Sequence, residues 1–219
     1  MTAPARAAFF DVDEPLVRVN TGRLYVRWRR RRGEAGVREL ARFGRWLTWY
    51  SLGVLNAEDV TRKALEALEG LDEATFRTEL RGWYDEWVRP EIAAAGRTEV
   101  ARRREAGFAP VILSASTPHA VGPLAEELGI EHVLCSRLEV QDGRFTGRCS
   151  ELCYGAGKLR AAARGAEAHG VDVGASAFYT DSISDLPMLE AVAEPRVINP
   201  DLRLRRAARR KGWPVERWR

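Results

Sequence analysis

The stretch Ala7-Ala8-Phe9-Phe10-Asp11-Val12-Asp13-Glu14-Pro15-Leu16-Val17 begins with an apolar run of the length of a buried strand. Two carboxylates, Asp11 and Asp13, end this run, and Pro15 then forces the chain to turn. Beyond a strand the alternation of side chains between two faces no longer has to hold, so both acids can converge on one point past the sheet edge. A solvated turn that carries two acids is the alternative interpretation.

Several polar side chains occupy corresponding places farther along the chain. Apolar strands are predicted at 110–113, 132–135, 177–180 and 196–198, and helices at 99–106, 117–128, 158–168, 187–192 and from 201 onward. This alternation predicts an α/β fold with a doubly wound parallel sheet. Ser114 ends one strand, Asp181 and Asp185 follow another, and Lys158 begins a helix. Because the carboxyl ends of parallel strands open on one side, these side chains are expected to meet the two N-terminal acids there.

An all-helical block separates the first strand from this α/β region. Helices are predicted near 24–28 and over 34–50, 57–68 and 72–88. The last of them carries an apolar stripe with two tryptophans, which predicts helix packing, with base stacking as the alternative. We therefore predict a core of residues 1–16 and 96–219, and an inserted all-helical block over 17–95. Within the core, the turn Gln141-Asp142-Gly143 predicts a β-hairpin flap at 136–148.

The composition is that of an ordinary globular protein, with 45% apolar and 30% charged residues. No apolar run has the length of a transmembrane segment, and we expect a cytoplasmic protein. The three cysteines, Cys135, Cys149 and Cys153, lack the second pair that a structural zinc needs, so buried or idle thiols are expected. The three histidines, at 119, 132 and 169, show no catalytic pattern.

The net charge of +4 is small, but two segments concentrate the basic residues. Arg27 to Arg32 contains five arginines in six positions, and residues 203–211 form a second basic stretch. Solvated helix faces are the simpler interpretation, and binding of nucleic acid or an anionic membrane is the alternative. No obligate nucleic-acid partner is expected, and nothing in the sequence indicates an oligomeric state.

Four acids with a single lysine between them would repel one another by about 4 kcal/mol per close pair at an effective dielectric near 20. A cation among them would remove this repulsion, and ligands that are all oxygen favour Mg²⁺ over zinc. Each group also has a purely structural alternative. Ser114 could cap a turn, Lys158 could be a solvated residue, and Asp181 with Asp185 could be acids at a helix N-terminus.

Four segments in this order resemble the motifs of one family. They are Phe10-Asp11-Val12-Asp13, Ile112-Leu113-Ser114, Gly157-Lys158 and Tyr179-Thr180-Asp181-Ser182-Ile183-Ser184-Asp185-Leu186. The sequence resembles the haloacid-dehalogenase-like (HAD) phosphatases, subfamily IB, in the branch related to phosphoserine phosphatase. The resemblance spans nearly the whole chain, including the flap, and implies a Rossmann-like core with an inserted helical cap.

The resemblance also implies roles for the site residues. Asp11 would attack the phosphorus of a small phosphorylated substrate to give an aspartyl-phosphate, and Asp13 would act as general acid and base. Ser114 and Lys158 would bind phosphoryl oxygens. Mg²⁺ would be held by Asp11, the backbone carbonyl of Asp13, Asp181 and, directly or through water, Asp185.

Three departures from the family pattern bear on activity and substrate. Pro15 stands where the family usually has a threonine, which raises the alternative of a catalytically impaired scaffold that binds a phosphorylated ligand. Asn20 replaces the glutamate that grips the amino group of phosphoserine, and Ala115-Ser116 replaces a pair of glycines. Asn20 and Ser116 are therefore candidate substrate contacts. We predict a Mg²⁺-dependent phosphomonoesterase for a small organic or lipid-like phosphate other than phosphoserine.

Overall fold

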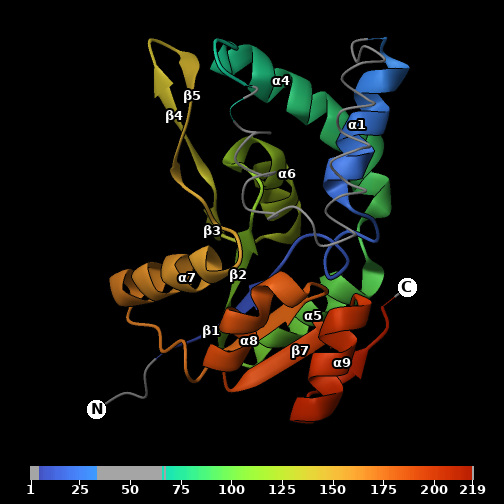
Figure 1. Cartoon of the computed structure of the whole chain (residues 1–219), viewed down its shortest axis with the longest axis vertical. Coiled ribbons are helices and arrows are strands. Elements are labelled where there is room, and N and C mark those ends of the chain that lie inside the picture. Colours follow the sequence, from blue (N-terminus) through green and yellow to red (C-terminus); the bar gives the residue numbers. More distant parts are fainter. Residues whose placement is uncertain (1–4, 34–65, 67, 219) are drawn as a thin grey trace.

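A parallel sheet of six strands forms the centre of the computed structural model, which describes residues 5–33, 66 and 68–218 (Figure 1). The strand order is β3-β2-β1-β6-β7-β8. The strands are β1 (Arg6–Phe10), β2 (Phe108–Ser114), β3 (His132–Cys135), β6 (Ala177–Thr180), β7 (Glu194–Ile198) and β8 (Val215–Glu216). Because β1 lies between β2 and β6, its carboxyl end is at the point where the strand order reverses, which is where ligands bind in such sheets.

Helices cover both faces of the sheet, which explains why β1 is apolar without alternation. Ala8 and Phe10 point to one face and Ala7 and Phe9 to the other, and all four are buried. On the first face pack α5 (Ala94–Glu105) and α6 (Pro118–Leu128). On the second face pack α7 (Ala156–His169), α8 (Leu186–Ala191) and α9 (Leu202–Lys211). The predicted doubly wound α/β fold is confirmed.

The inserted helices and the flap lie beyond the carboxyl edge of the sheet (Figure 1). The described helices of the insertion are α1 (Thr21–Arg31) and α4 (Glu73–Trp83), followed by a π-helical turn at Tyr84–Val88 and a 3₁₀ turn at Arg89–Glu91. The flap pairs β4 (Arg137–Gln141) with β5 (Arg144–Glu151) in antiparallel fashion. Its turn residues Asp142 and Gly143 both have positive φ, 51° and 75°, as the predicted hairpin chemistry requires.

Several predicted boundaries differ from the structure. The α-helical part of the predicted helix 72–88 ends at Trp83. Helices α5 and α7 begin earlier than predicted, since the predicted first residues were Glu99 and Lys158. Their first turns contain Ala and Gly, which give little apolar periodicity. Strand β8 was not predicted, because it has only two residues. The predicted helices 34–50 and 57–68 lie almost wholly outside the described residues, and the division into core and cap stays a prediction.

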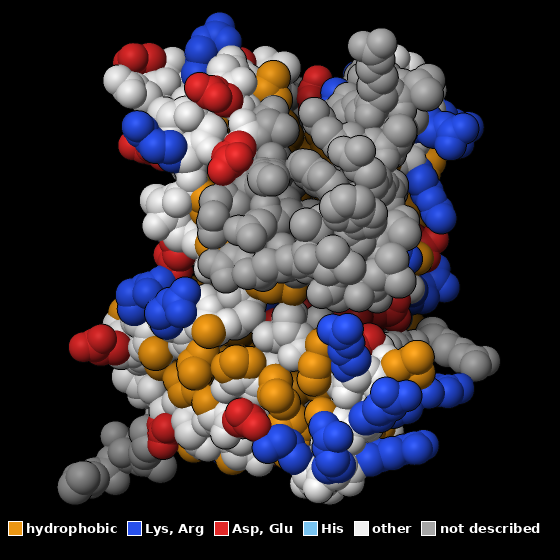
Figure 2. Space-filling model, viewed as in Figure 1, with side chains coloured by type: hydrophobic (Ala, Val, Ile, Leu, Met, Phe, Trp, Pro, Cys, Tyr) orange, Lys and Arg blue, Asp and Glu red, His pale blue; other side chains and the backbone are white. Residues whose placement is uncertain are grey.

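The molecular surface carries a basic patch over α9 (Figure 2). Four of its arginines are exposed, namely Arg203, Arg206, Arg209 and Arg210. Polyanion binding by this helix stays a hypothesis.

No helix among the described residues is both long enough and apolar enough to cross a membrane. Cys135 and Cys153 are buried free thiols, and burial raises the pKa of Cys135 to about 11.

Candidate active site

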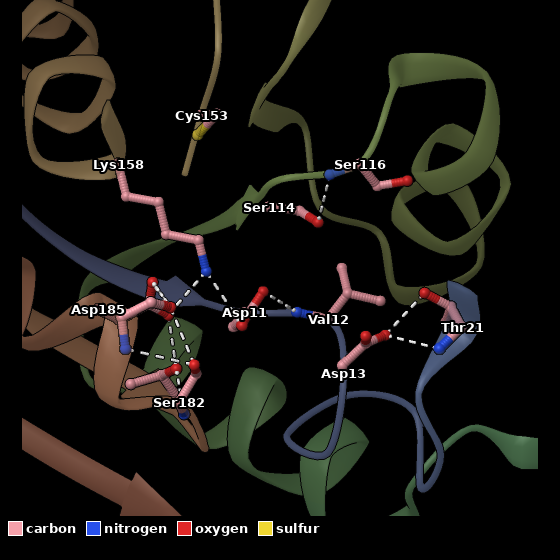
Figure 3. Close-up of polar contacts among 12 residues, drawn as sticks. Asp11, Val12, Asp13, Thr21, Ser114, Ser116, Cys153, Lys158, Ser182 and Asp185 are labelled. Atoms are coloured by element: carbon pink, nitrogen blue, oxygen red, sulfur yellow. Dashed lines mark hydrogen bonds and ion pairs between the residues drawn. The ribbon is translucent and has the colours of Figure 1, made fainter. Parts of the chain in front are cut away.

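Asp11 lies directly beyond β1, in the middle of the carboxyl edge. Its backbone N–H donates to the carbonyl of Tyr179 at 2.9 Å, which ties it to β6. One carboxylate oxygen accepts from the N–H of Val12 at 2.8 Å, and the other lies 3.0 Å from Nζ of Lys158 (Figure 3). Burial and the nearby carboxylates outweigh the opposing effect of Lys158 and raise the pKa of Asp11 to about 7.

Lys158 reaches this site from the first turn of α7 and is 2% exposed. The helix can begin there because Gly157 has no side chain: a Cβ at that position would lie 2.1 Å from the carbonyl oxygen of Leu152. Nζ of Lys158 also donates to Asp185 at 2.8 Å. Burial alone would lower the pKa of Lys158, but the carboxylates of Asp11 and Asp185 raise it overall, so the ammonium stays charged.

Asp181 and Asp185 approach the same place from the segment after β6. Asp185 is 1% exposed, and its carboxylate accepts a further hydrogen bond from Oγ1 of Thr180 at 2.6 Å. The side chain of Asp181 makes no hydrogen bond or ion pair within the part of the chain that the structure describes. Burial, together with the charges of Asp11 and Asp13, raises the pKa of Asp181 to about 9. The charge of Lys158 opposes this rise without cancelling it.

Asp13 is held by the first turn of α1 rather than by its own loop. Oδ1 accepts from the backbone N–H of Thr21 at 2.9 Å and from its hydroxyl at 2.7 Å. Oδ2 accepts from the side-chain amide of Asn20 at 2.6 Å. In Figure 3 the carboxylate of Asp13 points toward Thr21. Burial raises the pKa of Asp13, and the two hydrogen bonds from Thr21 oppose that rise.

The loop that carries both acids is compact and accommodates Pro15. The N–H groups of Leu16 and Val17 both donate to the carbonyl of Val12, at 3.1 and 2.9 Å. Glu14 adopts a positive φ of 72°. Gly96 lies so close to this loop that a Cβ there would be 2.2 Å from the carbonyl oxygen of Pro15. The close approach of α5 therefore fixes the loop from outside.

The remaining predicted residues lie around the same edge. Ser114 is the last residue of β2, is 4% exposed, and accepts a hydrogen bond from the N–H of Ser116 at 3.2 Å (Figure 3). Asn20 caps α1, with Oδ1 accepting from the N–H of Arg23 at 3.0 Å. The structure thus places Lys158 between Asp11 and Asp185, and the charges of these groups act on Asp181. Asp13 and Asn20 lie on the side of α1.

Sequence reasoning missed two hydroxyl groups, those of Thr21 and Thr180. The place of each threonine in the sequence indicates such a hydrogen-bonding role. Thr180 ends a buried strand directly before Asp181, and Thr21 opens a helix shortly after the acidic loop. A threonine that is buried at a strand end or placed in a first helical turn commonly supplies a hydrogen bond to a nearby polar group.

No three side chains of Asp, Glu, His or Cys among the described residues stand close enough to hold a metal ion by themselves. The geometry explains why. The ammonium of Lys158 lies between Asp11 and Asp185, and the carboxylate of Asp13 is turned toward α1. Any cation at this edge would therefore use a small number of carboxylates, together with backbone oxygen and water.

The fold and the site define a class of protein: a doubly wound α/β protein with acids after two neighbouring parallel strands and a buried lysine opening a helix beside them. The family model of the haloacid dehalogenase-like hydrolases matches residues 8–190. The chain belongs to this family, and the resemblance drawn from its motifs is confirmed.

Individual relatives are similar over different lengths. A probable phosphatase of Mycobacterium tuberculosis is 39% identical over 67% of this chain and 51% of its own length. The chain thus spans about half the length of that relative. A phosphoserine phosphatase of the same species is 33% identical over 97% of this chain and 71% of its own length. A crystal structure of a protein of unknown function from Bordetella pertussis is 27% identical with a TM-score of 0.88, covering 97% of this chain and 98% of that one.

Proposed function

We propose that the protein is a phosphomonoester hydrolase in which Asp11 is the nucleophile. The observation that carries this proposal is the position of Asp11 at the strand-order reversal, with one carboxylate oxygen 3.0 Å from a buried, charged lysine. Attack by this carboxylate forms an oxygen–phosphorus bond while the bond from phosphorus to the leaving oxygen breaks. Water then displaces the aspartate from phosphorus, which divides one difficult hydrolysis into two displacements.

The donor set fits a magnesium ion. The carboxylates of Asp11 and Asp181 and the backbone carbonyl of Asp13 would hold it, and Asp185 would contribute directly or through water. Mg²⁺ commonly keeps several water ligands and is bound by one or two carboxylates, so a larger protein cage is not required. The raised pKa of Asp181, which burial and the neighbouring carboxylates cause despite the charge of Lys158, supports this assignment, because a cation would relieve that repulsion. When bound, the ion supplies positive charge that lets a carboxylate approach a phosphate dianion.

The other site residues act on the phosphoryl group and on protons. Lys158 and the hydroxyl of Ser114 would hold phosphoryl oxygens, and the charge of Lys158 would offset the charge that spreads over them in the transition state. Asp13 would give a proton to the leaving oxygen in the first displacement and take one from water in the second.

We further propose a small organic or lipid-like phosphate, other than phosphoserine, as the substrate. Asn20 supports this choice, because a neutral amide cannot pair with a substrate ammonium group as a carboxylate does. This amide is also already engaged with Asp13 and with the N-terminus of α1. Phosphate release from a panel of phosphorylated metabolites, with phosphoserine included, tests this prediction. Preferential hydrolysis of phosphoserine would contradict it.

The central experiment measures hydrolysis of p-nitrophenyl phosphate. We expect turnover that requires Mg²⁺, disappears with a chelator and returns when the metal is restored. Asp11→Asn should lower turnover by about a thousandfold or more, because the amide cannot act as the nucleophile. Asp142→Asn is the matched control, since Asp142 lies in the exposed hairpin turn. Turnover that survives Asp11→Asn would refute the mechanism, and an inactive wild-type protein would favour the binding scaffold.

A further inference from the structure

The carboxylate of Asp13 takes its side-chain hydrogen bonds from α1. Thr21 supplies two donors to Oδ1, at 2.9 and 2.7 Å, and Asn20 supplies one to Oδ2, at 2.6 Å. No other hydrogen bond to this carboxylate occurs within the described ranges of the chain. Pro15, two residues after Asp13, has neither a hydroxyl nor an N–H to offer. Asp13 belongs to the loop after β1, but α1 therefore sets the orientation of its carboxylate.

The two donors from Thr21 act on the same oxygen. A carboxylate rotates broadly about its last torsion unless hydrogen bonds hold it. Two converging donors on Oδ1 fix the plane of the group and leave Oδ2, with a single amide neighbour, as the oxygen that can exchange a proton. Proton transfer needs this oxygen within hydrogen-bond reach of the reacting atom, so a rotated carboxylate transfers protons poorly.

We propose that Thr21 is a positioning residue for proton transfer by Asp13. This inference rests on the proposed phosphomonoester hydrolysis. In the first displacement, protonated Oδ2 gives its proton to the leaving oxygen as the bond from that oxygen to phosphorus breaks. In the second, the same oxygen takes a proton from water as the water oxygen bonds to phosphorus and Asp11 departs. Thr21 keeps Oδ2 in place for both transfers.

The test compares two substrates of similar shape that differ in how much their leaving groups need a proton. Phenolate is a strong base and leaves slowly without protonation, whereas p-nitrophenolate is a much weaker base. For Thr21→Val we expect kcat/KM to fall about tenfold or more with phenyl phosphate and to stay within about twofold with p-nitrophenyl phosphate. The second displacement should also slow, so p-nitrophenolate should appear in a pre-steady-state burst of one equivalent per enzyme.

Two variants separate positioning from stability. Thr21→Ser keeps the hydroxyl and should restore the kcat/KM of phenyl phosphate. Thr75→Val is the matched control, because Thr75 donates its N–H and its hydroxyl to Oδ1 of Asp72, both at 2.8 Å, at the start of α4. It removes the same kind of hydrogen bond from a cap helix and should leave the ratio of the two kcat/KM values unchanged. Thermal melts of all variants confirm that they are folded.

Each outcome decides the inference. A selective loss with phenyl phosphate, restored by Thr21→Ser and absent in Thr75→Val, supports it. Equal losses with both substrates, or no loss with either, overturn the positioning role while hydrolysis by the wild type leaves the proposed function standing. A wild-type protein that hydrolyses neither phenyl phosphate nor p-nitrophenyl phosphate overturns both proposals together.

Discussion

Among the site residues, Lys158 is the one whose substitution should lower the free energy of unfolding most directly. It is buried between the carboxylates of Asp11 and Asp185, at 3.0 and 2.8 Å. Lys158→Met would leave two buried carboxylates without their cation, so we expect the free energy of unfolding without metal to fall by about 3–5 kcal/mol. Turnover should be lost as well. Urea denaturation in the presence of a chelator measures the stability change.

The control for this variant is another lysine in an ion pair. Lys211 lies 2.7 Å from Glu190, and both side chains are more than two-fifths exposed. Lys211→Met should therefore change stability by less than about 1 kcal/mol. Similar effects of the two substitutions would show that Lys158 does not neutralise the acidic cluster.

Pro15 is the residue that departs most clearly from the family pattern, and the structure suggests that it does not limit the rate. Thr21 and Asn20 already provide donors to Asp13. We expect Pro15→Thr to keep kcat/KM for p-nitrophenyl phosphate within about twofold and to lower stability by about 0.4–1 kcal/mol, since proline restricts the unfolded chain. A rate increase of tenfold would instead identify Pro15 as the cause of an impaired active site.

At the scale of elements, β1 and β6 are each followed directly by an acid, Asp11 and Asp181, whose pKa rises on folding. The pKa of Asp11 rises from 3.8 to about 7, and that of Asp181 from 3.8 to about 9, in both cases mainly through burial. The folded protein therefore holds protons that the unfolded chain has released. This contribution is fully present below pH 3.8 and is lost as pH rises through the folded pKa values, so metal-free stability should fall between about pH 4 and pH 9.

Thermal melts between pH 5.5 and 9, with chelator or with Mg²⁺, measure this dependence. Mg²⁺ should raise the melting temperature more at pH 8 than at pH 6, because it binds the ionised carboxylates. Asp181→Asn should flatten the pH dependence in chelator. A chelated protein that becomes more stable with rising pH across this range, or an Asp181→Asn variant with the wild-type slope, would contradict the assignment.

The sequence was sufficient to predict the strands at this edge, because β1, β2 and β6 are short apolar runs that end in polar residues. Parallel pairing then brings those ends together, which is why Asp11, Ser114 and Asp181 could be placed on one edge before any coordinates were known. The contact between Asp13 and Thr21 could not be predicted in this way. It depends on where α1 begins and how it lies against the loop, and apolar periodicity determines neither.

Local geometry also escaped prediction where it depends on packing. Tyr84–Val88 continues α4 as a π-helical turn, and its periodicity resembles that of an ordinary helix. The close approaches at Gly96 and Gly157 are visible only once α5 and α7 are in place. The sequence contained these glycines but gave no indication of which carbonyl each would face.

At the scale of the whole molecule, Glu127 of α6 joins the inserted helices to the core. Its carboxylate accepts from the hydroxyl of Tyr84 at 3.0 Å, from Nε of Arg89 at 2.8 Å and from Arg97 at 2.9 Å. Tyr84 and Arg89 follow α4, whereas Arg97 belongs to α5. Two further contacts, Arg81–Glu126 at 2.8 Å and His119–Glu73 at 2.9 Å, connect α4 with α6 along its length.

Because one carboxylate accepts from three donors on three elements, Glu127→Gln should weaken the junction of the insertion with the core. The arginines are about half exposed, so we expect a loss of about 1 kcal/mol and a fall in melting temperature of about 2–4 °C. Glu126→Gln, which among the described residues loses only the ion pair with Arg81, is the control and should cost less. Hydrolysis of p-nitrophenyl phosphate should be unchanged in both variants, because neither residue contacts the acids at the sheet edge. A lower kcat/KM for Glu127→Gln at wild-type stability would mean instead that this junction governs how the inserted helices close over the site.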